Sequence, residues 1–104
     1  MGSYRGKFDI IADILEAASQ ESKKTHIMYQ ANLSHKVLKK YLKKLREASL
    51  ISFVCDKQCY VLTVKGRNYL DAYNEYSRSS RELAKRLSEV DDKRKDLEGL
   101  LLNI

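Results

Sequence analysis

The residues with the clearest chemistry in this chain are a run of cations between positions 34 and 48. Six basic side chains stand there against one acidic residue, Glu47, so this stretch carries +5 of the chain's total charge of +6. Clustered ammonium and guanidinium groups release counterions from a polyanion, which is how proteins bind the phosphates of nucleic acids. The basic residues of the run are Lys36, Lys39, Lys40, Lys43, Lys44 and Arg46.

The spacing of these cations places them on one side of a helix that we expect over about 35–48. An apolar stripe with intervals of three and four residues is formed by Leu38, Tyr41, Leu42 and Leu45. At 100° per residue the lysines fall on the opposite side. Ser34 is expected to cap this helix, because its hydroxyl can accept from the free N–H groups of the first turn.

The rest of the chain supplies the elements that position this helix. Apolar periodicity predicts two further helices before it, and β-branched and aromatic residues after Leu50 predict a hairpin with a three-residue loop. Thr63 is expected to cap a last helix. We expect helices over about 8–20, 25–31 and 35–48, strands over 51–55 and 59–63, and a final helix from about residue 64.

This order is that of a winged helix-turn-helix, an α+β fold that is mainly α. The lysines lie on the second helix of the pair, which enters the major groove of double-stranded DNA in that fold. A three-helix bundle with a merely solvated lysine face is the other interpretation. Bases would be approached from the start of the helix and phosphates from its cations, from the preceding helix and from the hairpin loop. The expected DNA-binding residues are Lys24, Ser34, His35, Lys36, Lys39, Lys40, Lys43 and Lys57.

The C-terminal part of the chain carries a heptad repeat. Two sets of mostly apolar positions recur every seven residues, with charged residues on their flanks, which is typical of a coiled coil. We therefore expect a DNA-binding domain over 1–66 and a dimerisation helix over 67–104. The expected dimerisation residues are Tyr73, Tyr76, Leu83, Leu87, Val90, Leu97, Leu101 and Ile104.

The repeat favours an antiparallel pair. When paired residue numbers sum to 177, Leu87 meets Val90 of the second chain, and Arg94 runs its stem along Leu83 with its charge in solvent. A parallel pair would bury Arg94 against Arg94, which is costly. Other antiparallel registers remain open.

Several stretches resemble the archaeal winged-helix regulators and small chromatin proteins, across about residues 8–73. They lie at 24–34, 38–42, 50–51 and 60–66, and the run Leu-Thr-x-Lys-Gly at 62–66 is the most specific of them. The subgroup with a C-terminal helical rod is most similar. The resemblance implies a homodimer joined by an antiparallel coiled coil, with DNA-binding domains at opposite ends. It leaves open a transcriptional regulator or an architectural chromatin protein.

The cysteines do not indicate a metal centre. Cys55 and Cys59 flank the expected hairpin loop, where we place them directly opposite each other; a disulfide is geometrically possible there, and two ordinary thiols are the alternative. The C-x3-C spacing, with His26 and His35 before it, does not match a zinc finger.

Other function classes find little support. The sequence has no phosphate-binding glycine loop, no His–carboxylate cluster and no nucleophile placed beside a base, so we expect no enzyme and no cofactor. No apolar run is long enough for a signal peptide or a membrane span, which predicts a cytoplasmic, nucleoid-associated protein. The second functional hypothesis is an interaction module whose winged helix docks an acidic protein partner.

Overall fold

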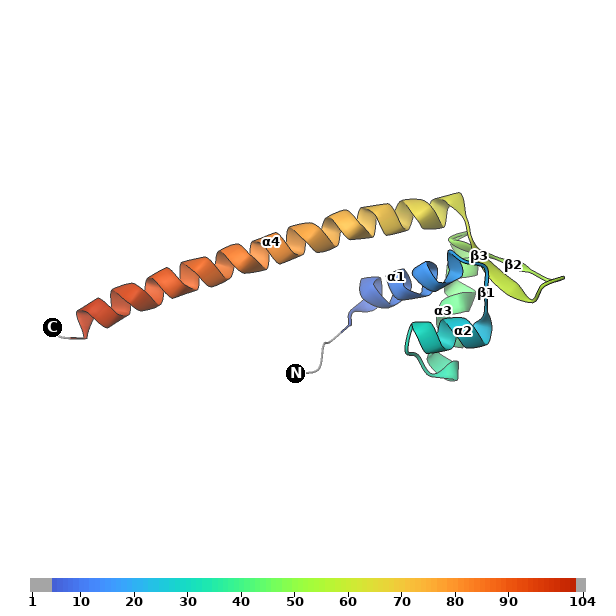
Figure 1. The fold of residues 1–104 in the computed structure, drawn as a ribbon, viewed down its shortest axis with the longest axis horizontal. Coiled ribbons are helices and arrows are strands. Elements are labelled where there is room, and N and C mark those ends of the chain that lie inside the picture. The colour runs from blue at the N-terminus through green and yellow to red at the C-terminus, as the bar shows by residue number, and fades with distance from the viewer. Residues whose placement is uncertain (1–4, 103–104) are drawn as a thin grey trace. The chain divides into compact units, whose positions relative to one another are not determined.

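The computed structural model describes residues 5–102, and its elements follow the predicted order with one added strand (Figure 1). The fold is mainly helical with a small antiparallel sheet, as expected. Ile104, an expected dimerisation residue, lies outside the described residues. The elements are α1 (Lys7–Ala18), β1 (Ser22–Lys23), α2 (Lys24–Gln30), α3 (His35–Glu47), β2 (Ile51–Val54), β3 (Cys59–Leu62) and α4 (Val64–Leu101).

The chain divides into two compact units, Met1–Tyr73 and Asn74–Ile104. The first unit thus includes the opening turns of α4, beyond the boundary at residue 66 that the sequence suggested. The reason is packing, because Leu70 is only 2% exposed and belongs to the core of the first unit. Five side chains at the centre of that core are fully buried: Ile14, Leu15, Ile27, Leu38 and Leu70.

Strand β1 is the element that the sequence did not predict. It pairs with β3, with Ser22 opposite Tyr60 and Lys23 opposite Cys59, so the sheet order is β1-β3-β2. Two residues are too few to show the alternation that identifies a strand. The turn before it is equally hard to predict, because Glu21 has a φ of 49° in the left-handed region that glycine or asparagine usually occupies.

The hairpin register differs from the expected one. Val54, not Cys55, lies opposite Cys59, so the loop has four residues, 55–58. Gln58 ends the loop at a φ of 54°, and its N–H donates to the carbonyl of Cys55 over 3.2 Å. A glutamine in that conformation gives no sequence signal for the four-residue loop that it ends. Both cysteines are free thiols, Cys55 exposed and Cys59 buried.

Thr63 joins the end of α3 to the start of α4. Its hydroxyl accepts from the N–H of Gly66 over 3.0 Å, which is the N-cap expected from the sequence. The same hydroxyl donates to the carbonyl of Ser49 over 2.6 Å, and the Thr63 N–H donates to the carbonyl of Leu50 over 3.2 Å. One residue therefore fixes both the turn after α3 and the first turn of α4.

Gly66 completes this joint because no larger residue fits. A Cβ built there would lie 2.2 Å from the carbonyl oxygen of Leu50 and 2.5 Å from Cδ1 of Leu62. Beside it, the Lys65 ammonium donates to the carbonyl of Ala48 over 2.7 Å, at the negative end of the α3 dipole. The Leu-Thr-x-Lys-Gly run is thus the contact that fixes α3 against the start of α4.

Tyr73, the last residue of the first unit, connects α4 to α1 by a hydrogen bond. Its hydroxyl donates to Oδ1 of Asp9 over 2.5 Å, while the N–H of Gly6 donates to Oδ2 over 2.9 Å. These bonds hold the pKa of Asp9 below its usual value, the Tyr73 bond contributing most. The same bond, with burial, raises the pKa of Tyr73 to about 12. The Tyr69 ring stacks on Tyr73 with centroids 6.5 Å apart.

Candidate nucleic-acid interface

Helix α3 begins as the sequence predicted. The Ser34 hydroxyl accepts from the N–H of Val37 over 3.2 Å and so caps the helix. This contact uses an oxygen lone pair and leaves the hydroxyl proton available to a ligand. Ser34 and His35 are both exposed at this end of α3.

The two sides of α3 have opposite character. Leu38, Leu42 and Leu45 are at most 3% exposed, which confirms the apolar stripe, while Tyr41 is only partly buried against the core. Every cation of the 34–48 run is exposed. Five of these six cations line one of two separate pockets on α3. Lys40 and Lys44 line a small groove of about 130 Å³ with Val37 and Tyr41.

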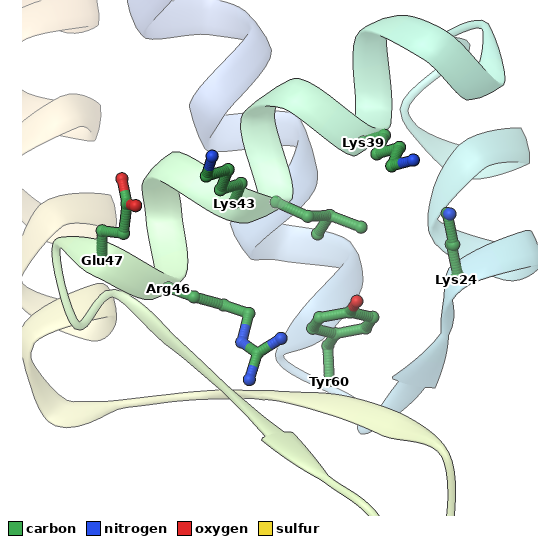
Figure 2. Close-up of a pocket in the computed structure, with 7 residues that line it drawn as sticks. Lys24, Lys39, Lys43, Arg46, Glu47 and Tyr60 are labelled. Atoms are coloured by element: carbon green, nitrogen blue, oxygen red, sulfur yellow. The ribbon is translucent and has the colours of Figure 1, made fainter.

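Helix α3 also lines a larger open pocket of about 510 Å³, shared with α2 and β3 (Figure 2). The pocket brings together three expected site residues, Lys24, Lys39 and Lys43. Of the four lining residues that were not predicted for the site, two can donate hydrogen bonds to an anion, Arg46 and Tyr60. We call it the α3–β3 pocket, and its lining residues are Lys24, Lys39, Leu42, Lys43, Arg46, Glu47 and Tyr60.

Arg46 is held in place by the sheet. Its Cζ lies 5.5 Å from the centroid of the Phe53 ring, a cation–π contact, and Phe53 packs on Tyr60 with centroids 5.0 Å apart. Arg46 belongs to the cationic run of the sequence, but its guanidinium lies over Phe53 of the β2–β3 hairpin. Tyr60 carried no sequence signal beyond its place in a strand.

Five predicted site residues do not line this pocket, namely Ser34, His35, Lys36, Lys40 and Lys57. Lys57 is in the hairpin loop, where its ammonium stands 4.0 Å from Oε1 of Glu21. Its charge is therefore partly offset within the chain, although both side chains are largely exposed. Lys36 is exposed on α3 without lining the pocket.

The described residues hold no group of three metal-ligating side chains, and His26 and His35 are both exposed. Within the same residues, no helix combines the length and apolarity needed to cross a bilayer.

The second unit, taken by itself, is a helix with a largely exposed apolar row. Leu83, Leu87, Val90, Leu97 and Leu101 are each 60–64% exposed, and Tyr76 is 57% exposed. Tyr73 differs from the other expected dimerisation residues, because it is half-buried in the first unit.

Arg94 interrupts the apolar row, and its guanidinium is held along its own helix. It donates to Asp91 over 2.7 Å and also to Glu98. The bonds from Arg94 and Lys95 lower the pKa of Asp91.

Comparison with known proteins agrees with this architecture. No curated protein matches the chain. A solved structure described as Sso10a-2, a DNA-binding protein from Sulfolobus solfataricus, shares the fold with a TM-score of 0.79 and 23% identity, over 85% of this chain and 95% of that one. Residues 4–81 match the winged helix-turn-helix family, and this match spans most of the chain. The chain therefore belongs to the winged helix-turn-helix family.

Proposed function

We propose that the chain binds double-stranded DNA and that α3 enters the major groove. The observation that carries the proposal is the exposed cationic side of α3, opposite a buried leucine stripe. In a helix-turn-helix the second helix of the pair occupies the groove, and α3 holds that position. The similar Sulfolobus solfataricus protein is described as DNA-binding, which supports the same use of the fold.

The residues divide by the part of DNA that they would touch. The α3 lysines would neutralise phosphates on both sides of the groove, and Lys24 and Lys57 would add backbone contacts. Ser34 and His35 stand at the exposed start of α3, the end that reaches base edges. The proposed phosphate ligands on α3 are Lys36, Lys39, Lys40 and Lys43.

The composition of α3 favours weak sequence preference. Specific readout relies on Arg, Asn and Gln side chains that make paired hydrogen bonds to bases. Helix α3 has no Asn or Gln, and its one arginine, Arg46, lies against Phe53. An architectural role at the nucleoid therefore fits better than a strict regulator of one site.

We further propose a homodimer through the second unit. The apolar row of the second unit is more than half exposed, which is unfavourable in water. A second copy of the chain carries the same heptads and can bury the row in a coiled coil. In the antiparallel register summing to 177, Arg94 lies beside Leu83 of the partner. Because Asp91 and Glu98 bind its guanidinium along the helix surface, Arg94 can cover Leu83 with its stem without burying its charge.

The functional consequence of an antiparallel dimer is spacing. The helix from Asn74 to Leu101 is about 40 Å long at 1.5 Å per residue. Two DNA-binding units at opposite ends of such a rod need not fit adjacent major grooves, which are roughly 34 Å apart. The dimer would then hold separated sites or bridge two duplexes.

Mobility shifts test the DNA proposal. The chain should bind two unrelated duplexes with similar affinity, and Lys36→Ala/Lys40→Ala/Lys43→Ala should weaken binding to both. Because these side chains are exposed, the melting temperature should stay within a few degrees of the parent's. Replacement of Arg81 and Lys85 by glutamine, on the second unit, is the control for nonspecific charge loss. Binding to acidic proteins with none to duplex DNA would instead favour the interaction-module hypothesis.

Crosslinking tests the dimer. Leu87→Cys/Val90→Cys, in a chain with Cys55 and Cys59 replaced by serine, should link position 87 to position 90 of the partner after mild oxidation. A parallel pair would link 87 to 87 and 90 to 90. Peptide mapping separates these outcomes, and like-to-like links would favour a regulator that binds a palindromic site.

A further inference from the structure

The α3–β3 pocket gathers more positive charge than the chain itself neutralises. Lys24 comes from α2 and Lys39, Lys43 and Arg46 from α3, with Glu47 as the one acidic lining residue. Across the part of the chain that the structure describes, none of these four cations has an ion-pair partner within 4.0 Å. Like charges brought together without a counterion repel one another, so such a pocket favours an anion from outside.

The pocket also holds donors suited to one kind of anion. The Phe53 ring limits the positions open to the Arg46 guanidinium, whose planar fork binds two oxygens of one phosphate. Figure 2 shows the ammonium groups of Lys24 and Lys39 pointing toward each other and the Tyr60 hydroxyl pointing up into the pocket. Guanidinium, ammonium and hydroxyl donors around an apolar floor at Leu42 fit a phosphate group joined to a less polar sugar.

The size of the pocket argues for a chain rather than a single ion. About 510 Å³ is more space than one phosphate fills, and the pocket is open rather than enclosed. An open groove between a recognition helix and a strand admits a polymer that enters and leaves it. The pocket is also separate from the groove that Lys40 and Lys44 line on α3.

We propose that the α3–β3 pocket seats a segment of sugar–phosphate backbone, with Arg46 and Tyr60 as direct phosphate ligands. The inference rests on the proposed DNA binding and deepens it. It adds a phosphate-binding site between α3 and the sheet to the contacts proposed for the exposed lysines of α3. It also assigns a role in DNA binding to Arg46 and Tyr60, which are not among the α3 lysines.

Two substitutions that leave the net charge unchanged test the proposed phosphate site. Arg46→Lys keeps the charge but removes the guanidinium fork, and Tyr60→Phe keeps the ring but removes the hydroxyl. Simple attraction between charges predicts no change for either. The phosphate site predicts about fivefold weaker duplex binding for Arg46→Lys and a smaller loss for Tyr60→Phe, with nearly unchanged salt dependence. Arg81→Lys, on the second unit, is the matched control and should bind like the parent chain.

A third variant tests the charge itself. Lys24→Gln should lower the slope of log affinity against log salt by about 0.9, the value of one lost phosphate contact. Lys85→Gln removes the same charge from the second unit and should leave the slope nearly unchanged. Thermal melting of every variant checks that the first unit is folded. If Arg46→Lys disturbs the packing on Phe53, Tyr60→Phe still tests the proposed phosphate site, because it removes only a hydroxyl.

A probe without DNA locates the phosphate site. Tripolyphosphate added to the ¹⁵N-labelled chain should shift the Arg46 Nε–H and the Lys24 and Lys39 amide signals, and an unlabelled duplex should shift the same signals. Duplex binding by the parent chain that none of the pocket variants weakens would overturn the phosphate site and the proposed Lys24 contact, but not DNA binding by the other α3 residues. A parent chain that binds no duplex would overturn the phosphate site and the proposed function together, and tripolyphosphate shifts in that case would mark a site for free oligophosphates.

Discussion

Gly66→Ala is predicted to destabilise the chain, although the same change inside a helix normally stabilises it by about 1 kcal/mol. The new Cβ would lie 2.2 Å from the carbonyl oxygen of Leu50, at least 1.2 Å inside ordinary contact at 3.4 Å. That oxygen accepts the bond from the N–H of Thr63, so moving it also loosens the joint between α3 and α4.

The magnitude follows from these two effects. Overpacking against backbone costs about 1–3 kcal/mol, and the weakened hydrogen bond adds about 1 kcal/mol. After the helix preference is subtracted, a net loss of about 1–3 kcal/mol remains. For a folded unit of this size, each kcal/mol lowers the melting temperature by about 4–8 °C.

Thermal and urea unfolding at one fixed protein concentration measure this loss. Gly99→Ala is the matched control, because Gly99 lies in the same helix and its added Cβ would meet nothing within 4 Å. We expect Gly99→Ala to be neutral or slightly stabilising. If Gly66→Ala melted at or above the temperature of the parent chain, the steric account of the Leu-Thr-x-Lys-Gly run would be wrong.

Three further predictions concern the first unit's contacts, the pocket and the dimer. Tyr73→Phe should lower the melting temperature at pH 7, because it removes the bond to Asp9. The difference in melting temperature between parent and variant should shrink as Asp9 is protonated at a pH below 3.8, since its pKa is lowered from that value. It should shrink again between pH 10 and about 12, as Tyr73 ionises in the parent chain. A difference that stays constant with pH would contradict the assigned bond. Glu47→Gln removes the one acidic group of the α3–β3 pocket and should tighten duplex binding by about two- to fivefold, the range for an exposed charge; weaker binding in anisotropy titrations would argue against an anion in that pocket. A chain ending after residue 78 should sediment as a monomer, because most of the apolar row is removed; a persistent dimer would place the interface in the first unit.

Much of the fold was predictable because it follows from periodicity and capping. The apolar stripe of α3, the cap at Ser34 and the cap at Thr63 are local patterns, and all three were confirmed. The errors lie where the backbone takes left-handed conformations without glycine. Glu21 precedes the unpredicted β1, and Gln58 shifts the hairpin so that Cys55 does not face Cys59.

The candidate site shows the same division. The cations of α3 were visible in the charge count, because one helix supplies them. The α3–β3 pocket was not, because it depends on how α2, α3 and β3 pack together. Arg46 lines the pocket with its guanidinium over the Phe53 ring, and Lys57 lies apart beside Glu21. Contacts between elements that are distant in sequence leave no periodic signal.

The salt dependence of duplex affinity tests the central claim most directly. Fluorescence anisotropy of a labelled duplex, titrated with the parent chain and with Lys36→Ala/Lys40→Ala/Lys43→Ala at several salt concentrations, gives the two slopes of log affinity against log salt. If α3 lies in the major groove and each lysine meets a phosphate, the slope of the triple variant should be shallower by about 2.7. Equal slopes for the two chains would show that α3 is not the element that binds DNA.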